Sequence, residues 1–273
     1  MSNSAQSVKD KLKNISREKN VDFNSVMRFY MYDRFVERLS KSKYKDNFIL
    51  KGGFYLSKLF GLDNRSTMDI DTAIRKTEFT EENLIVMINE IISIDVGDNV
   101  KFKIEKTELI REEDEYGGLR ITINFMLENI KDKFHIDLAT GDPIYPRPDN
   151  YKYESLIGDE IYKVWSYNLE TILAEKIETS SRMKDYYDIY LIYKFKFDTI
   201  NKEKFRGSVE KTFKKRKFDA DLMTNLSIVK ESKVLRERWL SYSRKNSYAR
   251  DVEFEETLEC LEKLIDILIL HVI

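Results

Sequence analysis

The alternation of polar and apolar residues over positions 67–74 is the most informative pattern of the chain. Asp69 and Asp71 alternate there with Met68 and Ile70. Because residues i and i+2 of a β-strand share one face, the pattern predicts a strand with both carboxylates on one side and its apolar residues towards a core. Two neighbouring carboxylates repel each other, and a hard cation such as Mg²⁺ relieves that repulsion.

An apolar run and two glycines precede this strand. Residues 47–50 predict a buried strand, Gly52 and Gly53 a turn, and residues 53–61 a helix. A glycine turn at the start of a helix lets backbone N–H groups approach a phosphate, and the helix dipole favours the anion. The sequence therefore predicts a phosphate-binding turn beside a metal-binding carboxylate pair. Taken alone, the glycines are also explained by a tight turn and the acids by solvated strand positions.

Apolar periodicity predicts the elements around this motif. Residues 21–40 have the spacing of an amphipathic helix that packs on the sheet. Thr80, followed by two glutamates, is a candidate N-cap for a helix that runs to about residue 92. Two strands, 100–109 and 119–127, are predicted to form a hairpin around an acidic tip at 111–116.

A further strand, predicted at 133–138, carries the candidate third acid, Asp137. His135 and Asp137 share one face of it, opposite the apolar even-numbered residues. A carboxylate beside the first pair would accept a proton from an attacking hydroxyl or complete a metal site. Asp142, in the loop that follows, is the alternative, and a solvated Asp137 at a sheet edge is the simpler explanation. His135 is expected to be a supporting or surface residue.

A proline-rich loop divides the chain. Pro143, Pro146 and Pro148 are the only prolines of the sequence. We expect this rigid loop to end the catalytic sheet and the rest of the chain to be mostly helical. The predicted division is therefore an α/β domain at 1–150 and a helical domain at 151–273.

Lys176 is the candidate functional cation of the second half. Asn168 is a candidate N-cap for a helix running to about residue 183, and Lys176 falls on the apolar stripe of that helix. A buried lysine requires an anion. A nucleotide phosphate is one candidate, and an acidic side chain or a path for the ammonium to solvent is the other.

The run K-D-Y-Y-D begins at Lys184. In a helix Asp185 and Asp188 are three residues apart, and Lys184 and Asp188 are four apart. Either acid is a candidate for orienting Lys176 or a nucleotide. An ordinary intrahelical ion pair is the alternative.

Two basic segments distinguish the C-terminal part of a chain whose net charge is only −1. Segment 202–217 holds eight basic residues, and segment 233–250 holds six, interleaved with Trp239, Tyr242 and Tyr248. Basic groups would meet RNA phosphates and the aromatic rings would stack on unpaired bases. Solvated helix faces explain the segments equally well. The apolar spacing of 254–273 predicts a packing helix.

Composition narrows the class of protein. The 273 residues contain 42% hydrophobic residues, enough for a globular core. The single cysteine, Cys260, excludes an internal disulfide and a cysteine-rich metal site, and fits the cytoplasm. Residues 1–14 lack the apolar region of a secretory signal, and no apolar run approaches the roughly 18 residues of a membrane span. We therefore expect a cytoplasmic protein without a membrane partner.

The quoted motifs resemble those of nucleotidyltransferase toxins of the AbiEii/AbiGii type, in the polymerase-β-like nucleotidyltransferase superfamily. The resemblance rests on F-I-L-K-G-G-F-Y-L at 48–56 and R-S-T-M-D-I-D at 65–71. It extends to L-A-E-K-I-E at 173–178 and K-D-Y-Y-D-I-Y at 184–190, and so spans most of residues 20–195.

The resemblance implies an α/β (α+β) fold, with a mixed sheet, flanking helices and a helical C-terminal region that completes the active-site cleft. It implies transfer of a nucleoside monophosphate from an NTP to a hydroxyl, with pyrophosphate leaving. Asp69, Asp71 and Asp137 would hold Mg²⁺, with Mn²⁺ as an alternative, and Asp137 would assist the attacking hydroxyl.

Further site residues are carried over by the same motifs. Lys176, Asp185 and Asp188 are expected catalytic residues. The expected nucleotide-binding residues are Lys51, Gly52, Gly53, Arg65, Thr67 and Lys184. The family motif is usually written with Gly-Ser, whereas this chain has Gly53 at the second position and a long spacing to Asp69.

The resemblance also implies a toxin of a bacterial toxin–antitoxin or abortive-infection system, with a separately encoded antitoxin. RNA, preferably the 3′ end of tRNA, is the expected acceptor, bound through segments 202–217 and 233–250. A nucleotidyltransferase acting on a small molecule or a protein is one rival. A non-catalytic binding protein on the same scaffold is the other.

Overall fold

The computed structural model describes residues 5–110, 117–179, 182–219 and 221–269. The chain divides into two compact units, which are described separately. Unit 1 is Met1–Gly141 with Asp149–Ser166, and unit 2 is Asp142–Pro148 with Tyr167–Ile273.

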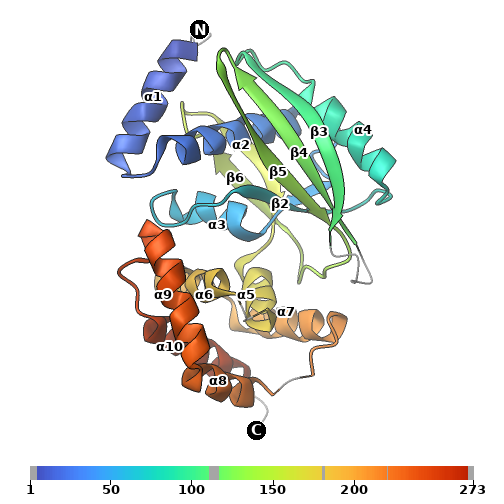
Figure 1. Ribbon diagram of the computed structural model, residues 1–273. Coiled ribbons are helices and arrows are strands. Elements are labelled where there is room, and N and C mark those ends of the chain that lie inside the picture. Colours follow the sequence, from blue (N-terminus) through green and yellow to red (C-terminus); the bar gives the residue numbers. More distant parts are fainter. Residues whose placement is uncertain (1–4, 111–116, 180–181, 220, 270–273) are drawn as a thin grey trace. The chain divides into compact units, whose positions relative to one another are not determined.

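Unit 1 is built from four helices and seven strands of the described chain (Figure 1). Its helices are α1 (Ala5–Glu18), α2 (Phe23–Lys41), α3 (Gly52–Phe60) and α4 (Glu81–Ile92). Its strands are β1 (Phe48–Leu50), β2 (Asp69–Ile74), β3 (Val100–Ile110), β4 (Gly118–Leu127), β5 (Ile130–Ala139), β6 (Asp149–Glu154) and β7 (Ile161–Ser166).

The seven strands form one mixed sheet in the order β3-β4-β5-β2-β1-β7-β6. β2 runs parallel to β5 and β1 parallel to β7, while the other neighbours are antiparallel. The predicted mixed α/β fold is confirmed. Because β2 lies between β1 and β5, the carboxylates of β2 stand beside both the glycine turn that follows β1 and the strand of Asp137.

Helices cover one face of β3, β4 and β5. In Figure 1, α2 and α4 lie behind these strands, and α4 packs on both α2 and β3. The residues that face the helices are apolar and buried, among them Ile121, Ile123, Phe134 and Ile136. Polar residues alternate with them on the opposite face, as the period of two requires.

Side-chain caps fix where the helices of unit 1 begin. The Thr80 hydroxyl accepts a hydrogen bond from the Asn83 N–H at 3.3 Å, which confirms the predicted N-cap of α4. Asp22 caps α2 in the same way through the Ser25 N–H at 3.0 Å. Both caps satisfy backbone donors that the first turn of a helix leaves without a helical acceptor.

The prediction that the proline loop ends the sheet is wrong. β6 and β7 follow the loop, and β7 returns to pair with β1, with Ile49 opposite Trp165. Residues 151–166 therefore belong with the sheet, whereas 142–148 belong to unit 2, so the units divide elsewhere than at the expected boundary near residue 150. Tyr153, Tyr162 and Val164 alternate towards the core, but a short antiparallel hairpin leaves only this weak signal in the sequence.

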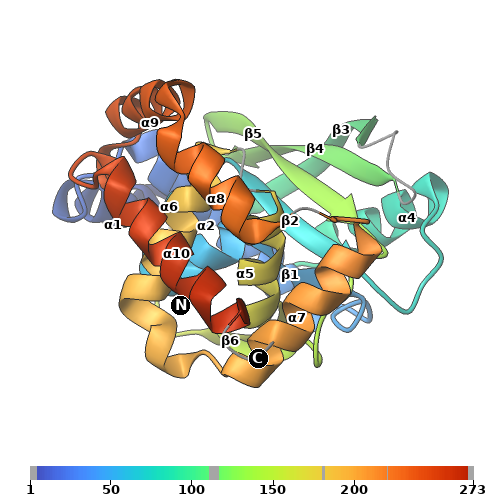
Figure 2. The ribbon, with the colours of Figure 1, turned by 90° about the horizontal axis from the view of Figure 1, so that it is seen from below.

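Unit 2 is helical throughout its described part, as predicted (Figure 2). Its α-helices are α5 (Leu169–Glu178), α6 (Met183–Lys196), α7 (Lys202–Lys215), α8 (Leu222–Glu231), α9 (Lys233–Lys245) and α10 (Phe254–Ile269). Two short 3₁₀ turns, Phe197–Thr199 and Ser247–Ala249, follow α6 and α9.

The start of α5 is confirmed and its end is not. The Asn168 side chain accepts the Thr171 N–H at 2.8 Å as the predicted cap. The helix ends at Glu178 instead of running to about residue 183, and α6 begins at Met183. Residues 180–181, the hairpin tip at 111–116 and the last residues of the predicted final helix lie outside the described residues.

Helix packing in unit 2 buries the apolar stripes. α5 packs on α6 and α7, and α10 packs on α6 and α8. Phe205 of α7 and Phe254, Leu261 and Leu264 of α10 are almost fully buried, which agrees with the packing role predicted for the last helix. Among the described helices, none has both the length and the apolar character needed to cross a bilayer.

Candidate active site

The three candidate acids lie on two adjacent strands. In the parallel pairing of β2 with β5, Asp69 is opposite His135 and Asp71 is opposite Asp137. Neighbouring strands are about 4.8 Å apart, so the side chains of Asp71 and Asp137 stand side by side on one face. The alternation Asp69-Ile70-Asp71 keeps Asp69 on that face, while Ile70 is buried in the core.

The glycine turn is shaped around Asp71. Gly52 has a φ of +59°, and a Cβ atom there would lie 2.6 Å from Asp71 Oδ2. The Gly53 N–H donates to the same oxygen at 3.2 Å, and the Lys51 N–H donates to the Asp71 carbonyl at 3.0 Å. A residue other than glycine at position 52 would adopt the left-handed conformation at a cost and collide with the carboxylate. The first amide hydrogen bonds of α3 thus hold Asp71 in place.

Gly53 makes room for Arg65 and Thr67. A Cβ atom on Gly53 would lie 3.0 Å from Arg65 Nη2 and 3.2 Å from Thr67 Oγ1. The Arg65 guanidinium is buried and its Nη1 donates to the Ser66 carbonyl. Glycine where the family motif usually has serine is therefore explained locally, because the arginine and threonine occupy the space of a larger side chain. The result is a cation at the first turn of α3.

Arg120 is a member of this site that the sequence reasoning missed. Its Nε and Nη2 donate to the two carboxylate oxygens of Asp137, each at 2.7 Å, and Nη2 lies 3.7 Å from Asp69 Oδ2. Arg120 is the cross-strand neighbour of Asp137 in the β4–β5 pairing. The alternation over 119–127 shows that Arg120 faces away from the core, but only the register places it beside Asp137.

Burial and the neighbouring charges raise the pKa of Asp69. Burial is the largest cause, followed by the negative charge of Asp137, while Arg120 acts in the opposite direction. The hydrogen bonds to Asp137 and the surrounding acids raise the pKa of Arg120, which stays positively charged. One guanidinium thus faces three carboxylates, and the site keeps an excess of negative charge.

A hard divalent cation fits Asp69 and Asp71. Their donors are carboxylate oxygens, and Mg²⁺ is commonly held by one or two carboxylates together with substrate phosphates. In the described part of the chain, no three His, Cys, Asp or Glu side chains are grouped closely enough to hold a metal ion by themselves. Asp137, the predicted third ligand, accepts a hydrogen bond from Arg120 at each of its carboxylate oxygens.

The two secondary candidates have structural partners. His135 Nδ1 lies 3.1 Å from the Thr122 hydroxyl of β4, on the face of the carboxylates. Asp142, the alternative third acid, belongs to unit 2 and accepts from Arg216 Nη2 at 3.4 Å. That contact gives Asp142 a role in the charge network of unit 2, where Arg216 also meets Glu175 and Glu178.

Lys176, Asp185 and Asp188 form one buried cluster in unit 2. Lys176 Nζ lies 3.0 Å from Asp185 Oδ1 and 2.5 Å from Asp188 Oδ2, and both acids have no exposed surface. Arg182 Nε donates to the other oxygen of Asp185 at 2.7 Å. The sequence did not decide whether Asp185 or Asp188 contacts Lys176, and in the structure both do. These two acidic side chains supply the anion that a buried lysine requires. Lys184 is exposed in the first turn of α6.

The comparisons with known proteins identify the family of the chain. The family model of the nucleotidyl transferase AbiEii toxin, type IV toxin–antitoxin system, matches residues 34–260. The chain belongs to this family. It is an AbiEii-type nucleotidyltransferase toxin, as the resemblance implied, and the family match adds that the toxin–antitoxin system is of type IV.

Solved structures share the fold of this AbiEii-type toxin. MenT4, a nucleotidyltransferase toxin from Mycobacterium tuberculosis H37Rv, is 14% identical with a TM-score of 0.60, and the match covers 94% of this chain and 98% of that chain. JHP933 from Helicobacter pylori is 13% identical with a TM-score of 0.51, and the match covers 88% of each chain. No curated protein matches the sequence. At these identities the similarity extends to the fold alone.

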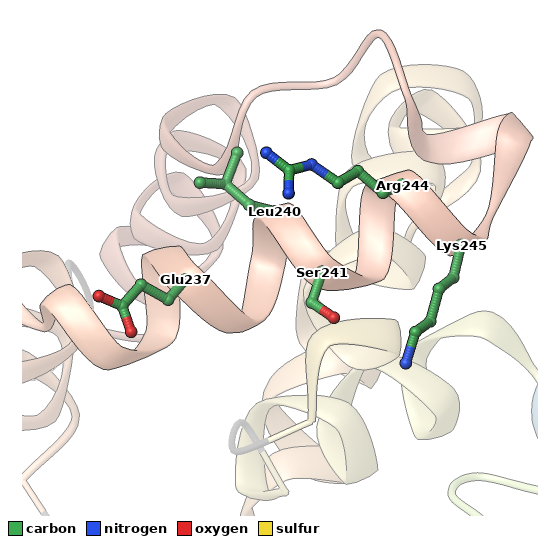
Figure 3. A pocket seen from close by; sticks show the side chains of 5 residues that line it. All are labelled: Glu237, Leu240, Ser241, Arg244 and Lys245. Atoms are coloured by element: carbon green, nitrogen blue, oxygen red, sulfur yellow. The ribbon is translucent and has the colours of Figure 1, made fainter.

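The basic segments of the toxin are only partly available to a ligand. In segment 202–217, Arg216 is committed to acidic neighbours, whereas Lys202, Lys204, Lys211, Lys214 and Lys217 are exposed. On α9, Lys233, Arg238, Arg244 and Lys245 are exposed. Figure 3 shows two of them, Arg244 and Lys245, which line a surface pocket of α9 together with Glu237, Leu240 and Ser241.

The expectation that Trp239 stacks on bases is wrong. Trp239 is 2% exposed, and its ring stacks on Phe254 with the two ring centroids 5.6 Å apart. Its Nε1 donates to the Val252 carbonyl at 3.0 Å. The hydroxyls of Tyr242 and Tyr248 lie 3.2 Å apart and hydrogen-bond each other. Tyr242 and Tyr248 are each half-buried, so of the three rings only that of Trp239 is closed to a base.

We expect Arg120→Gln to lower the turnover number about 10- to 100-fold with little change in the KM for NTP. The glutamine cannot make the bidentate hydrogen bond with the Asp137 carboxylate. Removing a contact that orients a metal-site residue typically lowers activity about 10- to 100-fold. Arg120→Lys keeps the positive charge but loses the bidentate geometry, so its turnover number should lie between those of Arg120→Gln and the wild type. Steady-state kinetics provide the measurement, with Lys43→Gln, which breaks an exposed pair with Glu90, as the control. An unchanged turnover number would show that Arg120 does not position Asp137.

Asp69→Asn should stabilise the metal-free protein at neutral pH. Because the pKa of Asp69 is raised in the folded state, the folded protein binds more protons than the unfolded chain between the ordinary and the raised pKa. Stability therefore falls as the pH rises through that window, and the penalty is fully present above the raised pKa. Thermal unfolding from acidic to neutral pH, without divalent cations, should show a smaller loss of Tm in the variant. Parallel curves for the two proteins would contradict this assignment.

Lys176→Met should destabilise unit 2 by about 3–5 kcal/mol, because it leaves two buried carboxylates without their shared cation. Lys184→Met, at an exposed position of the neighbouring helix, should change the stability by no more than about 0.5 kcal/mol. Denaturant unfolding followed by far-UV circular dichroism measures both. Equal midpoints for the two variants would mean that the Lys176 cluster does not hold the helices together.

Proposed function

We propose that this toxin transfers a nucleoside monophosphate from an NTP to a hydroxyl at the 3′ end of an RNA, in a reaction that depends on Mg²⁺. The tRNA 3′ end is the preferred acceptor. The observation that carries the proposal is the position of Asp69 and Asp71 on one face of β2, beside the glycine turn at the start of α3.

The start of α3 is the proposed triphosphate site. Backbone N–H groups and the dipole at a helix N-terminus favour a phosphate. The Arg65 guanidinium beside Gly53 adds a fixed positive charge there, and the Thr67 hydroxyl also lies beside Gly53. Mg²⁺ held by Asp69 and Asp71 would offset the negative charge that develops on the phosphate oxygens.

In the proposed reaction the acceptor hydroxyl oxygen bonds to the α-phosphorus, and the bond from that phosphorus to the bridging oxygen of pyrophosphate breaks. The hydroxyl proton is lost during the attack. Asp137 is the proposed proton acceptor, and Arg120 fixes the orientation of its carboxylate. Pyrophosphate carries away the electrons of the broken bond.

An RNA acceptor is supported by local charge. The chain as a whole is nearly neutral, yet α9 exposes Lys233, Arg238, Arg244 and Lys245 along its outer side. RNA binding through lysine and arginine requires such local patches and no overall positive charge. Membership of a type IV toxin–antitoxin family suggests a separate antitoxin partner.

A labelling assay tests the proposal. Purified protein is incubated with Mg²⁺, total tRNA and each α-labelled NTP in turn, beside the double variant Asp69→Ala/Asp71→Ala. We expect the label to reach tRNA only when both carboxylates are intact, with one NTP preferred. Chelation of the divalent cation should abolish the transfer.

The other outcomes separate the rival functions. Binding of NTP with Mg²⁺ but no labelling of any RNA would favour a small-molecule or protein acceptor. Failure to bind NTP at all would contradict the triphosphate site at Gly52 and Gly53. Equal cellular toxicity of the wild type and the double variant would indicate a non-catalytic binding protein.

A further inference from the structure

The strands β3, β4 and β5 have an outer face, opposite the face covered by α2 and α4. This outer face adjoins the carboxylates of the candidate active site. Strand register arranges its side chains in four cross-strand rows. From the acids outward, the rows are Asp71, Asp137, Arg120 and Glu108; Asp69, His135, Thr122 and Lys106; Lys133, Asn124 and Lys103; and Lys131, Met126 and Lys101. Acidic groups dominate at one end of the outer face and lysines at the other.

The lysines form two lines on either side of β4. Lys101, Lys103 and Lys106 follow β3, Lys131 and Lys133 follow β5, and all five are exposed. Strands are about 4.8 Å apart, so the two lines are separated by about 10 Å. From Asp137 to Lys131 the strand rises by about 20 Å, which is long enough for several nucleotides of a single strand.

Part of this positive charge has no acidic counterpart. Lys106 pairs with Glu108 at 2.9 Å, and Lys133 with Glu105 at 3.2 Å, both at exposed positions where ion pairs are weak. For Lys101, Lys103 and Lys131, no carboxylate of the described residues lies within ion-pair distance. A polyanion laid between the two lines would meet these three ammonium groups.

The residues between the lines suit a strand that is held mainly by its phosphates. Asn124 and the half-buried His135 offer hydrogen-bonding groups, and Met126 is the one apolar side chain in the four rows. The rows contain no phenylalanine, tyrosine or tryptophan for base stacking. Such a surface binds the nucleic-acid backbone with little preference for sequence.

We propose that the outer face of β3, β4 and β5 binds the single-stranded 3′ end of the acceptor RNA. Lysines on β3 and β5 hold its phosphates, and the strand leads its terminal hydroxyl to Asp69, Asp71 and Asp137. The RNA class of the ligand rests on the proposed function. The position of the binding surface rests on the register and exposure of unit 1 alone.

The experiment measures RNA binding without catalysis. The full chain carrying Asp69→Ala and Asp71→Ala is titrated with a fluorescein-labelled single-stranded oligoribonucleotide, and anisotropy gives the Kd over a series of salt concentrations. Three versions are compared: the parent, the parent with Lys101→Gln, Lys103→Gln and Lys131→Gln, and a control with Lys13→Gln, Lys45→Gln and Lys76→Gln. The control lysines are also exposed in unit 1 and change the net charge equally.

We expect the outer-face variant to bind several-fold more weakly and its slope of log K against log salt to be shallower by about 2, since each phosphate contact contributes about 0.7 on a single strand. The control should bind like the parent. Equal slopes for the outer-face variant and the parent would overturn the proposal.

Two further outcomes keep this inference distinct from the proposed function. A fourth version of the parent carries Lys233→Gln, Arg238→Gln and Arg244→Gln on α9. If this version loses RNA binding and the outer-face variant does not, the RNA binds to α9 and the outer-face proposal is overturned. If the parent binds no RNA, the proposal also fails. In that case NTP binding is measured separately with the wild-type chain. If the wild-type chain binds NTP, the proposed nucleotidyltransferase activity is retained with another acceptor; if it does not, that proposal fails as well.

Discussion

Electrostatic repulsion among three carboxylates is the constraint on which the site of unit 1 depends. Asp69, Asp71 and Asp137 share one face of two adjacent strands, and burial makes the ionised form of Asp69 still less favourable. The surrounding structure supplies hydrogen-bond donors to the carboxylates of two of them. The Gly53 N–H meets Asp71, and the Arg120 fork meets Asp137. Asp69 keeps the largest uncompensated share, which is the condition that a divalent cation would relieve.

The same constraint explains the glycine pair. Gly52 must be a glycine because its backbone has a positive φ and approaches the Asp71 carboxylate. Gly53 lies against the Arg65 guanidinium, so the turn brings a carboxylate and a cation to the first turn of one helix. A motif that resembles a general phosphate-binding turn thus serves first to position charged groups of the protein itself.

Unit 2 treats buried charge differently. Lys176, Arg182, Asp185 and Asp188 balance one another within hydrogen-bonding distance, so this cluster has little unmet charge. Arg216 satisfies three acids in a similar way. Such pairs fix the geometry of helices and lose much stability when one member is removed. The site of unit 1 is the part of the described chain where like charges are gathered with too few partners, which is typical of functional sites.

The sequence by itself determined the features that depend on neighbours along the chain. The alternation around Asp69 and Asp71, the glycine turn, the caps at Thr80 and Asn168, and the family motifs all depend on residues a few positions apart. Only the tertiary structure decided which distant groups meet. Strand pairing places Arg120 beside Asp137 and places β7, which follows the proline loop, beside β1. The same pairing places the lysines of β3 and β5 on one face. Helix packing gave Lys176 its two acids and buried Trp239. Periodicity shows which face of an element a residue occupies, but the partner of that face is set by contacts between segments far apart in the sequence.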